Sequence, residues 1–379
     1  VDQQAVRLIN ASDISVDFRD KKYEEYWQRI TYMEIGSNLI RYVGPEEFRR
    51  IMEAKELEAQ SSEDTVLSKK FEFSGKYGTD LMDEVKRYAL IASAVAATND
   101  FDVIHAHDWL TYAAGVAAKS VSGKPLVVHM HATEFDRSGE NVNQSVYDLE
   151  RRGMEEADRV IAVSKLTRNI VIERYGIHPD KVSVAYNAVE PSDKSDLEYK
   201  RGVKEKVVTF LGRITFQKGP DYFVEAARKV LDKNPDVRFV MAGSGDMLHK
   251  TIRRVAELKM ADKFHFTGFL KGGDVDHMFG LSDVFVMPSV SEPFGIVPLE
   301  AMRSNVPVVI SKQSGVSEIL IHALKIDFWD VDAMADSIYG LLQYEGLSKM
   351  FRRYGKTEVD NLKWENAAIK VKEVYESVL

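Results

Sequence analysis

Cysteine is absent from this chain of 379 residues, which excludes disulfides, thiolate catalysis and cysteine-ligated metals. No apolar run reaches the roughly 18 residues that a membrane-spanning helix needs, and no signal peptide is visible after Val1. Acidic residues outnumber basic ones by 59 to 51, and the net charge of −8 argues against an extended nucleic-acid surface. We therefore expect a cytoplasmic protein with no transmembrane segment and no nucleic-acid partner.

Short β-branched runs alternate with amphipathic helical stretches from Asp102 onward. Continuous apolar strands between helices predict parallel sheets that are covered on both faces. A chain of this length is too long for one core, and a polar stretch after Tyr186 separates two series of strands. The sequence thus predicts an α/β protein with two doubly wound, Rossmann-like domains. The expected strands are Val103–His107, Leu126–His131, Val160–Val163, Val182–Tyr186, Val207–Leu211, Arg238–Ala242, Lys263–Thr267, Val284–Pro288 and Val308–Ser311.

The first hundred residues are less regular. Val6–Ile9 is typical of a strand, and Glu46–Glu63 is typical of a charged surface helix. A strand followed by a glycine-rich loop is not found in this region.

The most informative segment runs from Ser291 to Glu300 and carries two glutamates eight positions apart. It follows an apolar strand and leads into a helix that we expect to begin near Pro298. Backbone amides at the start of a helix favour phosphate, whereas carboxylates bind hydroxyl groups. Taken singly, either glutamate has an ordinary alternative role, as a first-turn residue or as a solvated loop carboxylate. Together they favour a ligand such as a nucleotide sugar.

The loop Gly212–Gly219 follows the first strand of the second domain, at the sheet edge where open α/β sheets bind ligands. Arg213 offers a planar guanidinium and Lys218 a point charge, a suitable pair for a diphosphate. A solvated loop with two ordinary cations is the alternative. The neighbouring glutamate segment favours phosphate binding. A later glycine turn, Gly243–Asp246, is interpreted as an ordinary turn.

Four histidines end two successive strands of the first domain, in His105–Trp109 and in His129–His131. Histidines at positions i and i+2 of a strand point to one face, so a metal site has to be considered. The alternative is that one histidine contacts a polar ligand while the others pack at the sheet edge. We favour the alternative because apolar Ala106 and Met130 intervene and no further cluster of ligands is evident.

The Gly212–Gly219 loop and the Ser291–Glu300 segment together resemble the motifs of retaining nucleotide-sugar glycosyltransferases of the group 1, family 4 type, which include glycogen and sucrose synthases. The resemblance extends from about Asp102 to the end of the chain, and His105–Trp109 favours the glycogen-synthase side. It implies the GT-B fold, with an N-terminal domain at residues 1–188, a nucleotide-sugar domain at 189–363 and a final helix at 364–379 that packs on the first domain. It also implies that neither a metal nor another cofactor is required.

By the same resemblance, Arg213 and Lys218 hold the donor diphosphate, Glu300 binds the ribose hydroxyls and Glu292 binds the hydroxyls of the donor sugar. His131 stands beside the transferred sugar. The remaining positions expected to contact substrate are His107, Gly212, Gly268, Gly295, Ile296 and Val297.

The resemblance implies a retaining transfer of a hexose, glucose being favoured, from a nucleoside-diphosphate sugar to a sugar or glucan acceptor. ADP-glucose with an α-glucan is the preferred pair, and UDP-glucose follows closely. A sugar-nucleotide epimerase and a catalytically weak nucleotide-sugar-binding module are the alternatives. Because these enzymes begin with a strand and a glycine-rich loop, we expect that the natural amino-terminal segment is missing from this chain.

Overall fold

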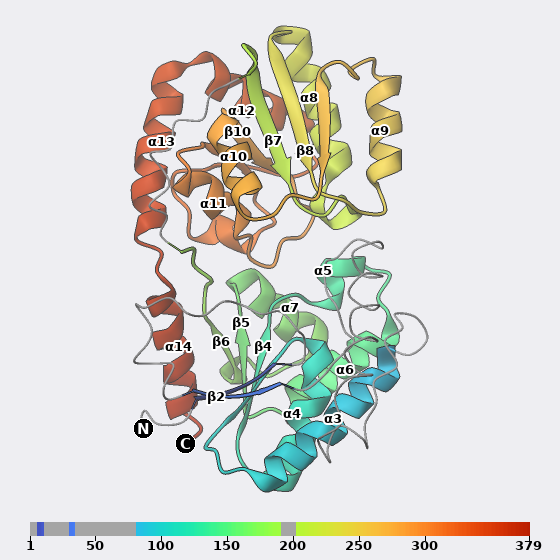
Figure 1. Cartoon of the computed structure of the whole chain (residues 1–379), viewed down its shortest axis with the longest axis vertical. Coiled ribbons are helices and arrows are strands. Elements are labelled where there is room, and N and C mark those ends of the chain that lie inside the picture. Colours follow the sequence, from blue (N-terminus) through green and yellow to red (C-terminus); the bar gives the residue numbers. More distant parts are fainter. Residues whose placement is uncertain (1–5, 11–29, 35–80, 191–201) are drawn as a thin grey trace, which may run out of the picture. The chain divides into compact units, whose positions relative to one another are not determined.

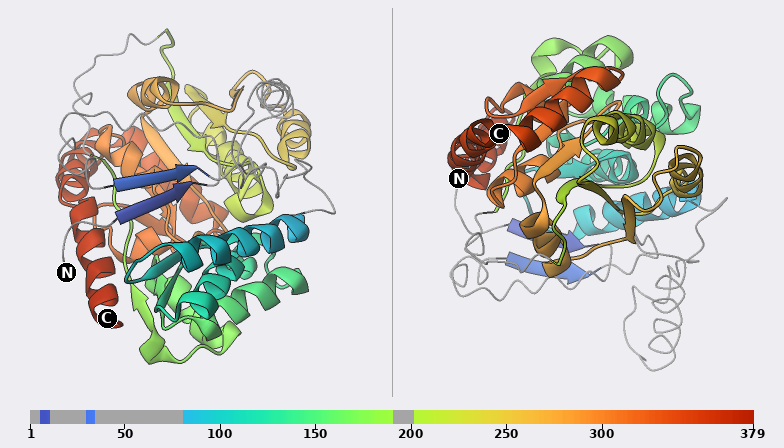
Figure 2. Two further views of the ribbon diagram at one scale, coloured as in Figure 1. Left: turned by 60° about the horizontal axis from the view of Figure 1, so that its bottom comes forward. Right: turned by 90° about the horizontal axis from the view of Figure 1, so that it is seen from above.

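The computed structural model describes residues 6–10, 30–34, 81–190 and 202–379. Contacts group the chain into two compact units, residues 1–104 with 113–124 and residues 105–112 with 125–379. In the first unit, β1 (Val6–Asn10) and β2 (Ile30–Glu34) pair in parallel (Figure 2). The strand predicted at Val6–Ile9 is thus confirmed, whereas Glu46–Glu63 lies outside the described residues.

Helix α3 (Leu81–Thr98) also belongs to the first unit. Two acidic residues, Asp83 and Glu84, stand in its first turn, where the helix dipole favours negative charge. Val85 and Ile91 are buried in this helix.

A four-stranded sheet carries the histidines and has the order β3-β4-β5-β6. Its strands are β3 (Ile104–His107), β4 (Leu126–Met130), β5 (Arg159–Ala162) and β6 (Val182–Val184). Every residue of β4 is buried, which explains its uninterrupted apolar character around His129. The helices of this region are α4 (Trp109–Ser122), α5 (Glu134–Ser138), α6 (Gln144–Glu156), α7 (Lys165–Tyr175) and the 3-10 helix η3 (Pro179–Lys181).

A six-stranded parallel sheet has the order β12-β11-β10-β7-β8-β9. The chain starts at β7, moves outward through β8 and β9, and then returns to β10 on the other side of β7. The two central strands are therefore a topological switch point, and their carboxyl ends open a crevice in which α/β proteins bind ligands. The strands are β7 (Lys206–Leu211), β8 (Val237–Ala242), β9 (Phe264–Gly268), β10 (Val284–Met287), β11 (Val308–Ser311) and β12 (Leu324–Ile326).

Apolar side chains cover both faces of this sheet, as β10 shows. Val284 and Val286 belong to one buried cluster, and Phe285 and Met287 belong to the other. The alternation follows from the two-residue repeat of a strand, and it explains why β10 is apolar at every position. Helix α8 packs against β8 and against α9 (Figure 1). The helical segments of this region are η4 (Phe216–Lys218), α8 (Pro220–Lys233), α9 (Leu248–Glu257), α10 (Gly273–Leu281), α11 (Val297–Arg303), η5 (Gly315–Glu318), α12 (Val331–Gln343), α13 (Glu345–Asp360) and α14 (Trp364–Glu376).

All nine strands expected from Asp102 onward are confirmed, with ends that differ by two residues at most. Strand β12 was not expected, because it has three residues and its central Lys325 is exposed. The domain boundaries at residues 188 and 363 stay predictions. Within the described residues, none of the helices combines the length and the apolar character needed to cross a membrane.

Candidate active site

The loops that follow β7 and β10 meet at the switch point. The amide of Val290 donates to the carbonyl of Gln217 at 2.9 Å, which ties the two loops together through the backbone. Gly219 lies so close that a Cβ there would stand 2.0 Å from the carbonyl oxygen of Pro288. Two predicted substrate loops, remote in sequence, are therefore held side by side.

Lys218 and Glu292 form an ion pair between these loops, with 2.5 Å from Nζ to Oε2. The hydroxyl of Ser289 donates to the same carboxylate oxygen at 3.2 Å. The two charged side chains are only 20% and 10% exposed, so solvent screens their attraction weakly. The backbone of Glu292 is fixed as well, because its amide donates to Gln313 and its carbonyl accepts from Gly315. The structure thus places two predicted site residues in direct contact.

Arg213 stands at the other end of the first loop and is exposed. Its Nη2 donates to Oε1 of buried Gln217 at 3.1 Å, which directs the guanidinium along the loop that carries Lys218. Gly212 hydrogen bonds through its amide to the carbonyl of Ala242 at 3.0 Å, so the backbone of this loop continues into the next strand end.

The turn after β8 has a larger role than predicted. Gly243 has a φ of +137°, and a Cβ at this position would lie 1.9 Å from the carbonyl oxygen of Gly212. Its amide donates to the carbonyl of Gly268 at 2.8 Å. Only glycine permits this approach. Gly243 thus connects the carboxyl ends of β7, β8 and β9 and positions Gly212 and Gly268, which were both predicted to contact substrate. The sequence did not predict this role of Gly243, because a glycine turn gives no indication of which other loop it will contact.

The segment from Gly295 to Glu300 turns into α11, which begins at Val297, one residue before the expected start. Gly295 has a φ of +102°, where side chains are strained. Ile296 and Val297 follow at the start of the helix, and Glu300 is half-buried in its first turn. Burial raises the pKa of Glu300, and the nearby Arg303 partly offsets that rise. The carboxyl group is therefore partly desolvated, and a hydroxyl donor from a ligand would be a favourable partner.

The four histidines cluster at the carboxyl ends of β3 and β4. Nδ1 of His107 and Nε2 of His131 are 2.9 Å apart and share a hydrogen bond. His105 stacks on His107, and its Nδ1 lies 2.5 Å from the hydroxyl of Tyr375 in α14. His129 is 7% exposed, and neither of its ring nitrogens has a hydrogen-bond partner among the described residues. The structure thus brings the predicted residues His107 and His131 into contact.

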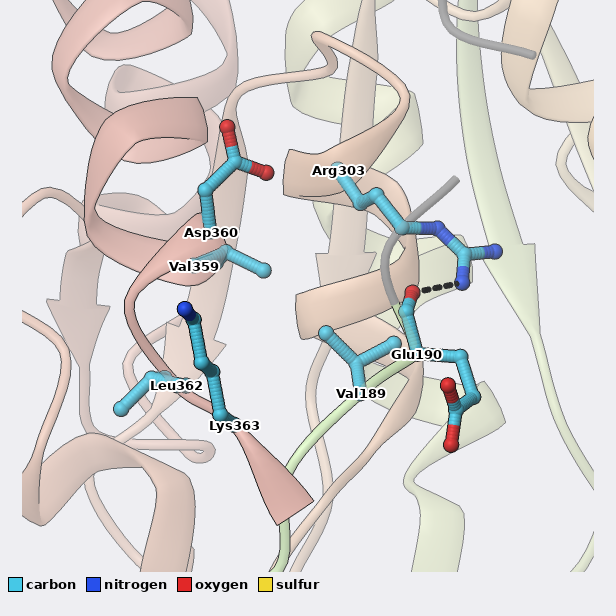
Figure 3. Close-up of a pocket in the computed structure, with 7 residues that line it drawn as sticks. All are labelled: Val189, Glu190, Arg303, Val359, Asp360, Leu362 and Lys363. Atoms are coloured by element: carbon cyan, nitrogen blue, oxygen red, sulfur yellow. Dashed lines mark hydrogen bonds between the residues drawn. The ribbon is translucent and has the colours of Figure 1, made fainter. Parts of the chain in front are cut away.

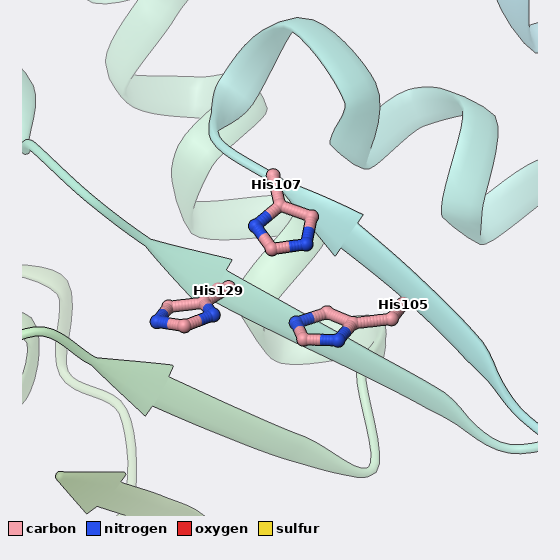
Figure 4. Close-up of side chains that lie close together, drawn as sticks. All are labelled: His105, His107 and His129. Carbon is pink, nitrogen blue, oxygen red and sulfur yellow. The ribbon is translucent and has the colours of Figure 1, made fainter. Parts of the chain in front are cut away.

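Burial, together with the neighbouring imidazoles, lowers the pKa of His105 to about 3, of His107 to about 4 and of His129 to about 2. These three rings are therefore neutral at pH 7. The ring nitrogens of these three residues lie within 4.8 Å of one another (Figure 4). Their planes are stacked at 9–28°, however, and stacked rings direct their in-plane lone pairs alongside one another rather than at one point. This geometry favours the interpretation that the cluster packs and hydrogen bonds.

The loop after β4 is fixed by buried carboxylates. Oδ1 of Asp108 accepts from the amide of His131 at 2.9 Å, and Asp108 itself adopts a φ of +59°. Further along, Arg137 pairs with Glu134 and with Glu150, whose side chain is fully buried. A buried pair of this kind holds its loop rigidly because either partner alone would be an unpaired charge.

Two further polar residues, Asp136 and Glu318, were not singled out from the sequence. Asp136 accepts from Thr133 in the capping box of α5 and also from Ser291 in the loop after β10. Glu318 accepts from the first two amides of α7, at Lys165 and Leu166. The pattern Thr-x-x-Asp indicates a capping box and could have identified Asp136 as structural. The contact with Ser291, 155 residues away, has no signal in the sequence.

A small surface cavity lies where the chain leaves the first sheet and passes the α13–α14 connection (Figure 3). Arg303 reaches over it and donates from Nη1 to the carbonyl of Glu190 at 2.6 Å. None of the predicted site residues lines it. The lining residues are Val189, Glu190, Arg303, Val359, Asp360, Leu362 and Lys363.

Comparison with known proteins decides the family. Residues 192–358 match the family model of group 1 glycosyl transferases, and residues 71–193 match that of glycosyltransferase family 4. A glycosyltransferase of Methanocaldococcus jannaschii, itself uncharacterised, is 32% identical over an alignment of 300 positions that covers 74% of this chain and 76% of that protein. The chain belongs to the group 1 glycosyltransferases. It is an enzyme that transfers a sugar from a nucleotide sugar.

Other relatives of this glycosyltransferase differ in activity. The α-maltose-1-phosphate synthase of Mycolicibacterium smegmatis is 29% identical over an alignment of 323 positions that covers 76% of this chain and 81% of that protein. Two solved structures share the fold at 20% identity. HepE of Anabaena, solved in complex with UDP and glucose, has a TM-score of 0.69 and covers 94% of both chains. Sucrose-phosphate synthase of Thermosynechococcus elongatus has a TM-score of 0.68 and covers 80% of this chain and 81% of its own. The expected GT-B fold is confirmed.

Proposed function

We propose that this glycosyltransferase moves glucose from a nucleoside-diphosphate donor to a sugar or glucan acceptor and retains the anomeric configuration. The observation that carries the proposal is the pair of Lys218 and Glu292 at the switch point, held between two loops whose backbones are hydrogen bonded. One residue offers a cation for phosphate and the other offers an acceptor for sugar hydroxyls.

In this proposal the donor diphosphate binds Arg213 and Lys218. The lysine then exchanges its carboxylate partner for a phosphate, which frees Glu292 to accept from the hydroxyls of the glucose. Glu300 accepts from the ribose, and the amides of Ile296 and Val297 face the sugar and phosphate. Gly212 and Gly268 give the ligand access to backbone, and His107 orients His131 beside the sugar through their shared hydrogen bond.

The transfer step needs little covalent chemistry from the protein. The bond from C1 of glucose to the phosphate oxygen breaks, and the acceptor oxygen forms a bond to C1 on the same face. The acceptor proton passes to the leaving phosphate. Positioning and stabilisation of the diphosphate supply most of the acceleration, because no protein nucleophile takes part.

We further propose that the two basic side chains, rather than a metal ion, neutralise the leaving diphosphate. Arg213 and Lys218 together supply two positive charges from one loop, which matches the charge that develops on the leaving group.

Glucose is our choice among the sugars that similar proteins bind or transfer. HepE was solved with UDP-glucose, and the relatives include an α-maltose-1-phosphate synthase as well as a galactosyltransferase that uses UDP-Gal. The motif at His105–Trp109 favours ADP-glucose with an α-glucan, so both donors belong in the test.

Calorimetry of ADP, UDP and GDP without added metal tests the site, and product analysis with ADP-glucose or UDP-glucose tests the reaction. We expect saturable binding of one diphosphate and a glucosylated maltooligosaccharide with α configuration by NMR. An isomerised sugar nucleotide would instead favour an epimerase. Binding without any product would favour a binding module, and no binding at all would overturn the proposal.

A further inference from the structure

Asp136 connects the loop after β4 to the loop after β10. Its Oδ2 accepts from both the amide and the hydroxyl of Thr133, each at 2.7 Å. Its Oδ1 accepts from the hydroxyl of Ser291 at 2.5 Å. Each carboxylate oxygen therefore serves a different loop.

This carboxylate is 3% exposed and accepts from three donors, so its position is firmly determined. Burial raises the pKa of Asp136, and the carboxylate of Glu292 contributes to the same rise. Asp136 and Glu292 thus lie in one electrostatic environment, although neither bonds to the other.

The two ends of this connection stand beside predicted substrate residues. Thr133 follows His131 by two positions, and Ser291 immediately precedes Glu292. Asp108 holds the other side of the first loop through the amide of His131. Without the contact between Asp136 and Ser291, the two loops would lose a direct side-chain connection next to the reacting sugar.

We propose that the hydrogen bond from Ser291 to Asp136 is a positioning element of the transfer reaction, which sets the spacing between His131 and Glu292. This inference rests on the proposed function. Asp136 and Ser291 touch no substrate in it. They act through the two residues that do.

A purely structural role would be confined to the capping box. Thr133 and Asp136 stabilise the start of α5 through Oδ2 alone, and that cap does not use Ser291. Ser291→Ala therefore removes the connection between loops and leaves the cap intact, whereas Asp136→Asn disturbs both.

The test measures kcat and KM of Ser291→Ala with the donor that the wild type prefers, together with the affinity for the matching diphosphate and the thermal unfolding midpoint. Ser291→Thr keeps the hydroxyl and serves as the conservative rescue. Ser120→Ala is the matched control, because its hydroxyl donates to the Val116 carbonyl of its own helix. We expect kcat to fall roughly 10-fold in Ser291→Ala, as for loss of one hydrogen bond to a charged group, with diphosphate affinity within about 2-fold.

A second measurement combines Ser291→Ala with Asp136→Asn. If both residues act through one hydrogen bond, the double variant should lose no more activity than the more damaged single variant. Multiplicative losses, or wild-type kcat in Ser291→Ala, would overturn the inference while the proposed function stands. A wild type that turns over no nucleotide sugar would overturn the proposed function, and the inference with it.

Discussion

The loops of the six-stranded sheet contain a charged pair, whereas the histidine cluster of the four-stranded sheet contains neutral rings. Lys218 and Glu292 form an ion pair, with 2.5 Å from Nζ to Oε2. His105, His107 and His129 stay neutral, since burial and mutual repulsion lower their pKa values to between about 2 and 4. If the proposed function holds, the ion pair belongs to the region that stabilises a charged leaving group, and the histidines supply neutral hydrogen-bonding groups.

The difference also has a thermodynamic side. Solvent screens the attraction within a mostly buried ion pair only weakly. Removal of one partner, however, leaves the other charge uncompensated. Neutral imidazoles tolerate burial but resist protonation. Variants of the first region should therefore affect binding and rate, and variants of the second should affect the response of stability to pH.

The largest effect is expected for Lys218→Ala. It removes a cation from the diphosphate site and leaves Glu292 without its charge partner. Losing one charge-assisted contact costs about 1.5–3 kcal/mol, which corresponds to a fall of roughly 10- to 150-fold in kcat. Steady-state release of nucleoside diphosphate measures this.

Lys229→Ala is the matched control, because it breaks an ion pair with Asp332 whose side chains are 45% and 78% exposed. Such surface pairs contribute little, so its rate should equal that of the wild type. Equal rates in both variants would contradict the assignment of Lys218.

A smaller effect is expected for Glu300→Ala, which should weaken diphosphate binding roughly 10-fold through loss of a charged acceptor for ribose. The kcat at saturating donor should change less than KM. Calorimetry with the nucleoside diphosphate and with the deoxyribose analogue separates the two causes. If the wild type and the variant lose the same affinity when the ribose is replaced by deoxyribose, Glu300 does not bind the ribose hydroxyl.

The two regions also differ in how far the sequence predicts them. The apolar runs of β7 and β10 identify the strands, and parallel connection places the loops with Lys218 and Glu292 at one sheet edge. The direct contact between these side chains depends on β10 returning beside β7, which periodicity does not encode. Gly243 and Asp136 were missed for the same reason, since their partners are remote in sequence and carry no shared pattern.

The histidine cluster gives a prediction for acid stability. A folded pKa of about 2 for His129, below the value of 6.5 in an unfolded chain, means that the unfolded state binds more protons at low pH. The stabilising contribution is complete above pH 6.5 and is lost as the pH falls below that value. Each such histidine contributes a slope of about 1.4 kcal/mol per pH unit in this range.

His129→Leu should therefore lower the slope of unfolding free energy between pH 6 and pH 4.5 by about one proton, or roughly 1.4 kcal/mol per unit. Urea unfolding at several pH values measures it. Met130→Leu, a buried change on the same strand without a titratable group, should alter stability and leave the slope unchanged. Identical slopes in wild type and His129→Leu would show that this histidine is protonated in the folded chain.

The smallest effect is expected from metal removal. If Arg213 and Lys218 neutralise the leaving diphosphate, incubation with EDTA should change the transfer rate by less than about 2-fold, and Mg²⁺ should not increase it. The same assay examines the histidine cluster, because a bound ion would need His129 among its ligands. A rate that falls with EDTA, returns with Zn²⁺ and is insensitive to both in His129→Leu would assign a metal to the four-stranded sheet. In that event the contrast between a charged and a neutral region would no longer hold, since the ion would make the histidines the more positive of the two.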